Sequence, residues 1–244
     1  MWQRFLHPLV SPKYFYQHIS KFSLGLAIIA VCFLIIGLIG GLYLAPADYQ
    51  QGEAFRIIYI HVPASFMSLT IYSFMTVLAL VILVWRIKVA EALLKSSVSI
   101  GLGMTFIALI TGSLWGKPMW GTAWIWDARL TSELILFFLY FAIFALFNAI
   151  RDPITAARIT AIVVLVGAVD VPIVHYSVNW WNTLHQGSTI TRLSKPTMDS
   201  SMLYPLLLMI AGFATYSLSI ILYRAKTEIL SREKNAQWVM QLFN

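Results

Sequence analysis

The chain alternates between long runs of apolar residues and short polar segments. Six runs contain almost no charged side chains, and each is close to the roughly 20 residues that a helix needs to cross the hydrocarbon of a bilayer. The predicted spans are residues 23–44, 57–85, 96–116, 134–150, 159–178 and 200–223, the fifth interrupted only by Asp170. The pattern predicts an all-α integral membrane protein with six transmembrane helices in a single membrane domain.

The composition supports this class and excludes others. Of the 244 residues, 59% are hydrophobic and 11% are charged, and the mean hydropathy is +0.78. A soluble domain carries roughly 25% charged residues, so a soluble globular enzyme is excluded. The single cysteine, Cys32, lies inside the first predicted span, which excludes an internal disulfide and a metal site built on cysteines.

The basic residues predict the orientation of the chain in the membrane. Twelve of the 17 Lys and Arg residues lie in the N-terminus, the 86–95 and 151–158 loops and the C-terminus. Short loops rich in Lys and Arg stay in the cytoplasm, so we expect both termini there, with residues 224–244 as a cytoplasmic tail. The net charge of +7 is then mostly a topology signal and does not indicate nucleic-acid binding.

Tryptophan is concentrated on the side predicted to face outward. The segment 115–129, between the third and fourth spans, carries Trp115, Trp120, Trp124 and Trp126, and Trp180 and Trp181 follow the fifth span. An interfacial aromatic belt would populate both membrane interfaces, whereas only three tryptophans lie on the inner side. Rigid aromatic planes give a large contact area at a small entropic cost, so we expect a surface that binds a planar apolar ligand.

Two glycines within this segment support the same interpretation. Gly116 and Gly121 allow the backbone to approach a flat ligand or another ring closely.

Three histidines lie on the same predicted side, namely His61, His175 and His185. His61 is just inside the second span, where an ionisable side chain indicates a functional site, although a hydrogen-bonded structural histidine remains an alternative. His185 is in the predicted outer loop, residues 178–199, ten residues beyond His175.

Two imidazoles beside many indoles favour haem over zinc. Zinc takes three or four N, S or carboxylate ligands, and no cysteine is placed to help. Haem needs one or two axial ligands, and its other contacts are apolar.

Cations on the outer side are candidates to meet the haem propionates, although a solvated or snorkelling charge remains an alternative for each. They are Arg56, Lys117, Arg129 and Arg192. Asp127 precedes the fourth span, where it either caps the helix or orients a group in the site. Asp170 needs a partner, for which Asn179, a histidine or a neighbouring subunit remain open.

These residues also carry a family resemblance. The segment from Trp115 to Asp127, with His61 before it and His185 after it, resembles the tryptophan-rich WWD domain of haem-handling membrane proteins. The chain has only six predicted spans, and its local sequence is similar to the CcmC family of bacterial cytochrome c maturation. Three stretches carry the similarity: His61-Val62-Pro63, 115–121 (WGKPMWG) and 182–187 (NTLHQG). The resemblance covers nearly the whole chain.

The resemblance implies a role in haem export: binding haem b at the periplasmic face of the bacterial inner membrane and presenting it to the haem chaperone CcmE. It implies CcmD and the ATP-binding cassette pair CcmA and CcmB as further partners, with no enzymatic site in this chain. It also implies that His61 and His185 are the axial iron ligands, and that Trp115, Trp120, Trp124, Trp126 and Asp127 belong to the platform for haem and chaperone. Two alternatives are a membrane b-type cytochrome in electron transfer and a transporter subunit without haem.

Overall fold

The computed structural model describes residues 10–185 and 198–242, and within them the chain is almost entirely helical, with no strand. Six stretches are long and apolar enough to cross a membrane, which confirms the predicted fold class. They are α3 (Phe22–Ile39) with η2 (Gly40–Leu44), η3 (Glu53–Ile57) with α4 (Ile58–Trp85), α5 (Lys88–Trp120), α6 (Ala128–Ala149), α7 (Pro153–Gly167) with α8 (Asp170–Trp180), and α9 (Ser200–Arg232). Short helical turns precede and follow them: α2 (Pro12–Tyr14), η1 (Phe15–Ile19) and α10 (Gln237–Met240).

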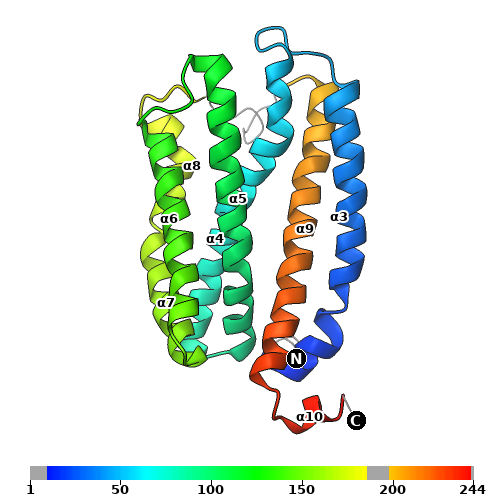
Figure 1. Cartoon of the computed structure of the whole chain (residues 1–244), viewed down its shortest axis with the longest axis vertical. Helices are drawn as coiled ribbons and strands as arrows, with labels where there is room; N and C mark the ends of the chain where they lie inside the picture. Colours follow the sequence, from blue (N-terminus) through cyan, green and yellow to red (C-terminus); the bar gives the residue numbers. More distant parts are fainter. Residues whose placement is uncertain (1–9, 186–197, 243–244) are drawn as a thin grey trace.

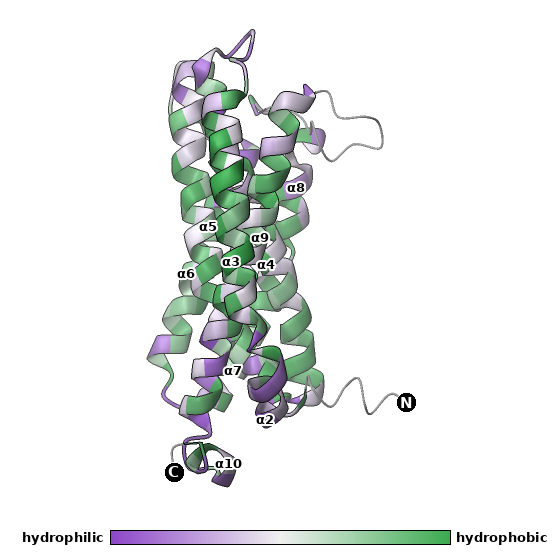
Figure 2. Cartoon of the chain, turned by 90° about the vertical axis from the view of Figure 1, so that its right-hand side faces the viewer, coloured by the Kyte–Doolittle hydropathy of each residue, from purple (hydrophilic) through white to green (hydrophobic). Residues whose placement is uncertain are grey.

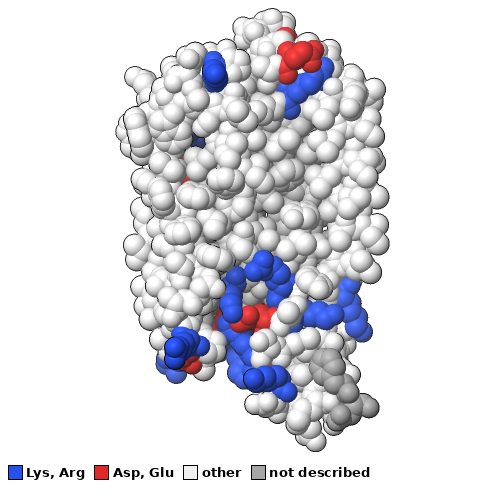
Figure 3. All heavy atoms as spheres, in the orientation of Figure 1, with Lys and Arg blue, Asp and Glu red and all other residues white. Residues whose placement is uncertain are grey.

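The spans lie side by side in one elongated bundle (Figure 1), with α3 packed on α9 and α4 packed on α5, α7 and α9. The turns α2 and α10 lie at one end of the bundle (Figure 2), and the turn from α5 to α6 lies at the other (Figure 1). Charged side chains gather towards the two ends and leave a broad, largely uncharged belt between them (Figure 3). That distribution is the one expected of a chain surrounded by lipid over its middle.

Several spans extend beyond their predicted bounds, and α5 and α9 do so the most. Helix α5 begins at Lys88, not near residue 96, and α9 continues to Arg232 before the α10 turn, taking up part of the expected tail. Charged residues in these added stretches form ion pairs, both between α5 and α9 and within α9. Arg232 binds Glu91 at 2.8 Å and Glu228 at 2.6 Å, and Lys95 binds Glu228 at 2.9 Å.

The fifth span is broken. Helix α7 ends at Gly167 and α8 begins at Asp170, and Pro172 follows in the first turn of α8. A proline has no backbone N–H, so the bond from residue 172 back to Ala168 cannot form, which is a common cause of a kink. The break therefore sits beside the one acidic residue of this span.

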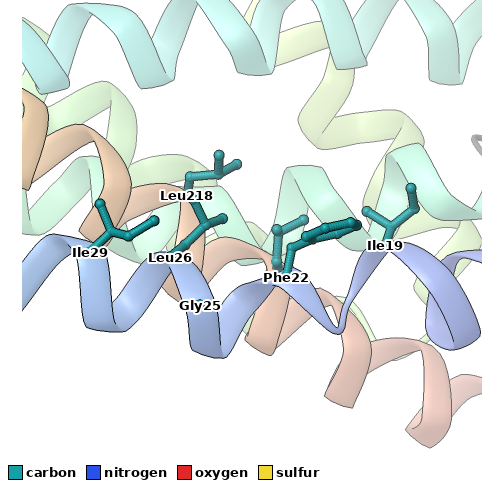
Figure 4. A pocket seen from close by; sticks show the side chains of 7 residues that line it. Ile19, Phe22, Gly25, Leu26, Ile29 and Leu218 are labelled. Carbon is teal, nitrogen blue, oxygen red and sulfur yellow. The ribbon is translucent and has the colours of Figure 1, made fainter.

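The interior lies mainly among α4, α5, α6 and α7. Tyr72, Met75, Leu94, Leu136 and Tyr140 are among its fully buried side chains. Helix α3 packs on the rim and is mostly exposed. A shallow apolar hollow lies between α3 and α9 (Figure 4) and is lined by Ile19, Phe22, Gly25, Leu26, Ile29 and Leu218 among others. All of the residues that line this hollow are apolar.

Candidate functional site

His61 is held in a fixed orientation inside the bundle. It lies in the second turn of α4 and is 9% exposed. Its Nδ1 is 3.1 Å from the carbonyl oxygen of Ala108 and 3.1 Å from the hydroxyl of Thr111, both on α5. A carbonyl oxygen only accepts, so we assign the proton to Nδ1, which leaves the lone pair on Nε2. An imidazole oriented in this way is the arrangement that metal-binding histidines use.

A glycine brings His61 close to α5. A Cβ atom at Gly112 would lie 3.0 Å from Cε1 of His61, tighter than ordinary van der Waals contact. A larger residue at this position would press on the ring, which is held by Thr111 beside the glycine and by Ala108 one turn before it. Sequence reasoning missed Gly112, Thr111 and Ala108, because nothing in their spacing marks them as partners of a histidine on another helix.

Trp115 borders the same ring. It lies in the last turns of α5, and its indole meets His61 edge to face, with ring centroids 5.7 Å apart. The indole nitrogen donates a hydrogen bond of 3.0 Å to the side-chain oxygen of Gln51, which comes from the turn between η2 and η3. A contact across 64 residues therefore fixes the plane of this ring.

His185 reaches the cluster from the segment that follows α8. Its ring centroid lies 6.3 Å from that of His61 and 6.4 Å from that of Trp120, and the residue is half-buried. Two histidines 124 positions apart in the sequence thus lie together with two indoles at one end of the bundle. His175 does not join them; it is exposed on α8, against Tyr176.

The first half of the tryptophan segment is helical. Helix α5 continues to Trp120, and Gly121 ends it with a φ of +78°, a left-handed conformation that suits glycine. Gly116 lies under the ring of Trp120, where a Cβ atom would come within 2.9 Å of that ring. The spacing of Gly116 and Trp120, four residues apart, is the sequence signal that could have shown this helical turn.

The second half of the segment is extended and leads into α6. Trp124 and Trp126 meet edge to face at 5.4 Å, and Trp126 is 76% exposed. Asp127 is the N-cap of α6, accepting a hydrogen bond of 2.8 Å from the backbone N–H of Leu130. Its second carboxylate oxygen and the indole nitrogen of Trp124 are buried without a hydrogen-bond partner among the described residues.

The candidate cations have structural partners. Arg56 binds the carbonyl oxygens of Gly41 at 2.7 Å and Ala45 at 3.1 Å, where η2 ends, and pairs with Glu53. Arg129 donates to the carbonyl of Val174 and, at 3.3 Å, to the hydroxyl of Ser65.

The remaining two cations differ in what the structure describes. Lys117 is exposed near the end of α5. Arg192 and most of the predicted loop 178–199 lie outside the described residues.

The similarity of the chain to known proteins identifies its family. The family model described as "Heme exporter protein C" (CcmC) matches residues 5–240. The chain belongs to this family. Proteins named heme exporter protein C from Escherichia coli (strain K12) and Haemophilus influenzae are 50% and 46% identical to it, each over 99% of this chain, covering 97% and 98% of their own lengths. A protein of that name from Bradyrhizobium diazoefficiens is 44% identical over 96% of this chain and 88% of its own. Membership of the heme exporter protein C family confirms the resemblance drawn from the tryptophan segment and the two histidines.

Proposed function

We propose that this chain binds haem b between His61 and His185 on the periplasmic side of the bacterial inner membrane, and presents it to a haem chaperone of the CcmE kind. The observation that carries the proposal is the convergence of the two imidazoles, 6.3 Å apart between ring centroids. An iron atom between the two rings would form a bond of about 2 Å to one nitrogen of each imidazole. Adding the distance from each of these nitrogens to its ring centroid gives a centroid separation of this size.

The donor set fits haem better than a bare metal ion. Among the described residues, no group of three or more His, Cys, Asp or Glu side chains is placed to hold a metal. A closed zinc site needs at least that many protein ligands, whereas a haem iron needs only the two axial ones. Trp115 and Trp120 beside the histidines supply the apolar surface that a porphyrin ring requires.

The two ligands differ in how firmly they are held, which suits delivery. His61 is buried and has two hydrogen-bond partners on α5, while His185 is half-buried on a segment outside the regular helices. We infer that His61 anchors the iron and that the side bearing His185 and the exposed Trp126 faces the chaperone. Gly116, under the ring of Trp120, and Gly121, at the end of α5, shape this surface.

The sidedness follows from charge and chain direction. The loops rich in Lys and Arg lie at the end of the bundle that holds α2 and α10, and the histidine cluster lies at the other (Figures 1 and 2). Under the positive-inside rule, the cluster faces the periplasm. The partners CcmD, CcmA and CcmB enter this proposal through the family, and ATP binding is assigned to the CcmA and CcmB pair.

The test is the absorption spectrum of the purified protein after loading with haem. We expect the bis-imidazole spectrum to be lost in His61→Ala and in His185→Ala. His175→Ala is the matched control, because this exposed histidine on α8 lies outside the cluster, and it should keep the spectrum. Unchanged spectra in both cluster variants would refute the ligand assignment.

Delivery is tested separately by adding the chaperone to the loaded protein. We expect the haem spectrum to move to the chaperone when the two are separated. Haem that stays on this chain would instead favour a fixed b-type cytochrome, and a wild-type protein that binds no haem would favour a transporter subunit.

A further inference from the structure

A line of polar side chains runs from His61 into the membrane interior along one face of α4. His61, Ser65, Ser68 and Tyr72 follow one another at helical spacing, and all four are buried. At 1.5 Å per residue, the line extends roughly 16 Å along the helix. Polar groups at this depth are costly unless they are paired, and usually mark a function.

Helix α6 faces this line with polar groups of its own. Arg129 donates to the hydroxyl of Ser65 at 3.3 Å. The hydroxyl of Ser68 donates to Glu133 at 2.9 Å, and the hydroxyl of Tyr140 donates to the carbonyl oxygen of Ser68 at 2.8 Å. Glu133 is 6% exposed, and its second carboxylate oxygen has no hydrogen-bond partner among the described residues.

The break between α7 and α8 brings a second acid to the inner end of the line. Asp170 is 8% exposed and, within the described part of the chain, one of its carboxylate oxygens also lacks a partner. The hydroxyl of Tyr72 lies directly over Gly167, one turn before Asp170, where a Cβ atom would come within 2.2 Å of it. Tyr72 is 0% exposed, and its hydroxyl is unpartnered in the same part of the chain. Asp170 interacts electrostatically with both Glu133 and Tyr72.

The charges at this place do not balance if both acids are ionised. Arg129, four residues before Glu133 on α6, is the nearby cation, and it interacts electrostatically with Glu133. Among the described residues, the other titratable groups that interact with the pair are Tyr72 on α4 and Tyr140 on α6, both neutral at ordinary pH. A second carboxylate would therefore be buried without a counter-charge, which is strongly unfavourable in a low-dielectric interior.

We propose that Asp170 and Glu133 form a proton-binding site inside the membrane, in which Asp170 carries the proton and Glu133 carries the charge balanced by Arg129. The geometry gives the roles: Glu133 accepts from Ser68 and shares a helix face with Arg129, whereas no cation within the described part of the chain pairs with Asp170. The unpartnered oxygen atoms of Tyr72 and Glu133 are the acceptors or relay groups that a mobile proton requires. A bound cation fits less well, because three free oxygen atoms are fewer than a hard cation prefers.

This inference does not depend on haem binding, and infrared spectroscopy of the purified full-length protein tests it. At neutral pH we expect the carbonyl stretch of a protonated carboxylic acid, shifted to lower frequency in D2O and lost in Asp170→Asn. The amide mimics the neutral acid in size and charge, so this variant should fold. Glu91→Gln is the matched control, since Glu91 is equally buried but paired with Arg232 at 2.8 Å; it should keep the band.

Three outcomes would overturn the proposal. A wild-type protein without the band would mean that both acids are ionised, and a band that persists in Asp170→Asn would place the proton elsewhere. A band that disappears when sodium chloride replaces choline chloride would identify a cation site. If Asp170→Asn fails to fold, Asp170→Glu is the second variant. It is expected to keep the band at a shifted frequency. A band at the wild-type frequency in this variant would also count against Asp170.

Discussion

The close packing of His61 against Gly112 gives the sharpest prediction for the candidate site. In Gly112→Ala the new Cβ atom would meet Cε1 of His61 at 3.0 Å, whereas ordinary contact begins near 3.4 Å. The ring must therefore move away from α5 by about 0.4 Å, the difference between these distances. Its bond to Ala108, now 3.1 Å, would lengthen to about 3.5 Å, beyond the usual hydrogen-bond range.

The loss of this orienting bond sets the expected magnitude. Removing a hydrogen bond that orients a metal-binding histidine typically costs 10- to 100-fold in affinity. The imidazole itself remains in Gly112→Ala, so we expect a loss of about 10-fold in haem affinity, or about 1.4 kcal/mol. Overpacking should also lower the free energy of unfolding by about 1 kcal/mol or more.

Gly103 provides the matched control on the same helix. A Cβ atom there has no heavy atom within 4 Å, so Gly103→Ala should bind haem like the wild type and gain up to about 1 kcal/mol of stability from its better helix propensity. The assay is a haem titration of the solubilised apo-protein followed by absorbance, with thermal unfolding measured alongside. Equal haem affinities for the two alanine variants would refute the reasoning.

Three further predictions concern the interior, the tryptophan segment and the orientation. Gly167→Ala should destabilise the protein by about 1–3 kcal/mol, because its Cβ atom would meet the hydroxyl of Tyr72 at 2.2 Å, and adding Tyr72→Phe should restore most of the loss in thermal unfolding. Asp127→Ala should cost about 1 kcal/mol through the lost N-cap of α6, measured in the same way. In a Cys32→Ser background, Thr122→Cys should react with a membrane-impermeant maleimide in cells whose outer membrane is permeabilised.

Each of these has its own control. Asp127→Asn should retain the cap, because asparagine caps as well as aspartate; a loss equal to that of the alanine variant would point to a role for the charge instead. Asn148→Cys, at the opposite end of α6, should stay unlabelled, and the reverse pattern would invert the proposed orientation. If Tyr72→Phe fails to rescue Gly167→Ala, the clash lies with Leu139, whose side chain is next nearest at 3.0 Å.

The six spans could be predicted from the sequence because a helix that crosses lipid requires a long uncharged run. Their ends were misplaced because each span was taken to stop at the first charged residue. Glu91 and Lys95 were placed before the start of the third predicted span, yet both lie within α5, paired with partners on α9. Likewise, Arg129 and Glu133 were placed before the fourth predicted span but lie in the first turns of α6, where Arg129 is half-buried and Glu133 is buried. A charge ends a span only when it has no partner inside the bundle, and sequence spacing does not reveal partners on other helices.

The candidate site could likewise be predicted only in part. Trp115, His61 and His185 could be picked out by residue type and by their side of the membrane. The groups that orient them, among them Gln51, Thr111 and Gly112, are ordinary residues whose role depends on contacts between segments far apart in the sequence. For Asp170, the described residues that interact with it electrostatically are Glu133 and Tyr72, and neither was among the partners considered from sequence.

The ion pairs that join α5 to α9 have a consequence for how the bundle can move. These pairs join Arg232, Glu91, Glu228 and Lys95, and they fasten the helices at the end of the bundle that holds α10, several turns from His61. A helix pair fixed at one end and free of such bonds at the other behaves as a lever, whose displacement grows with distance from the fastening. Room for a bulky flat molecule is therefore gained most readily at the far end, with little disturbance near the ion pairs.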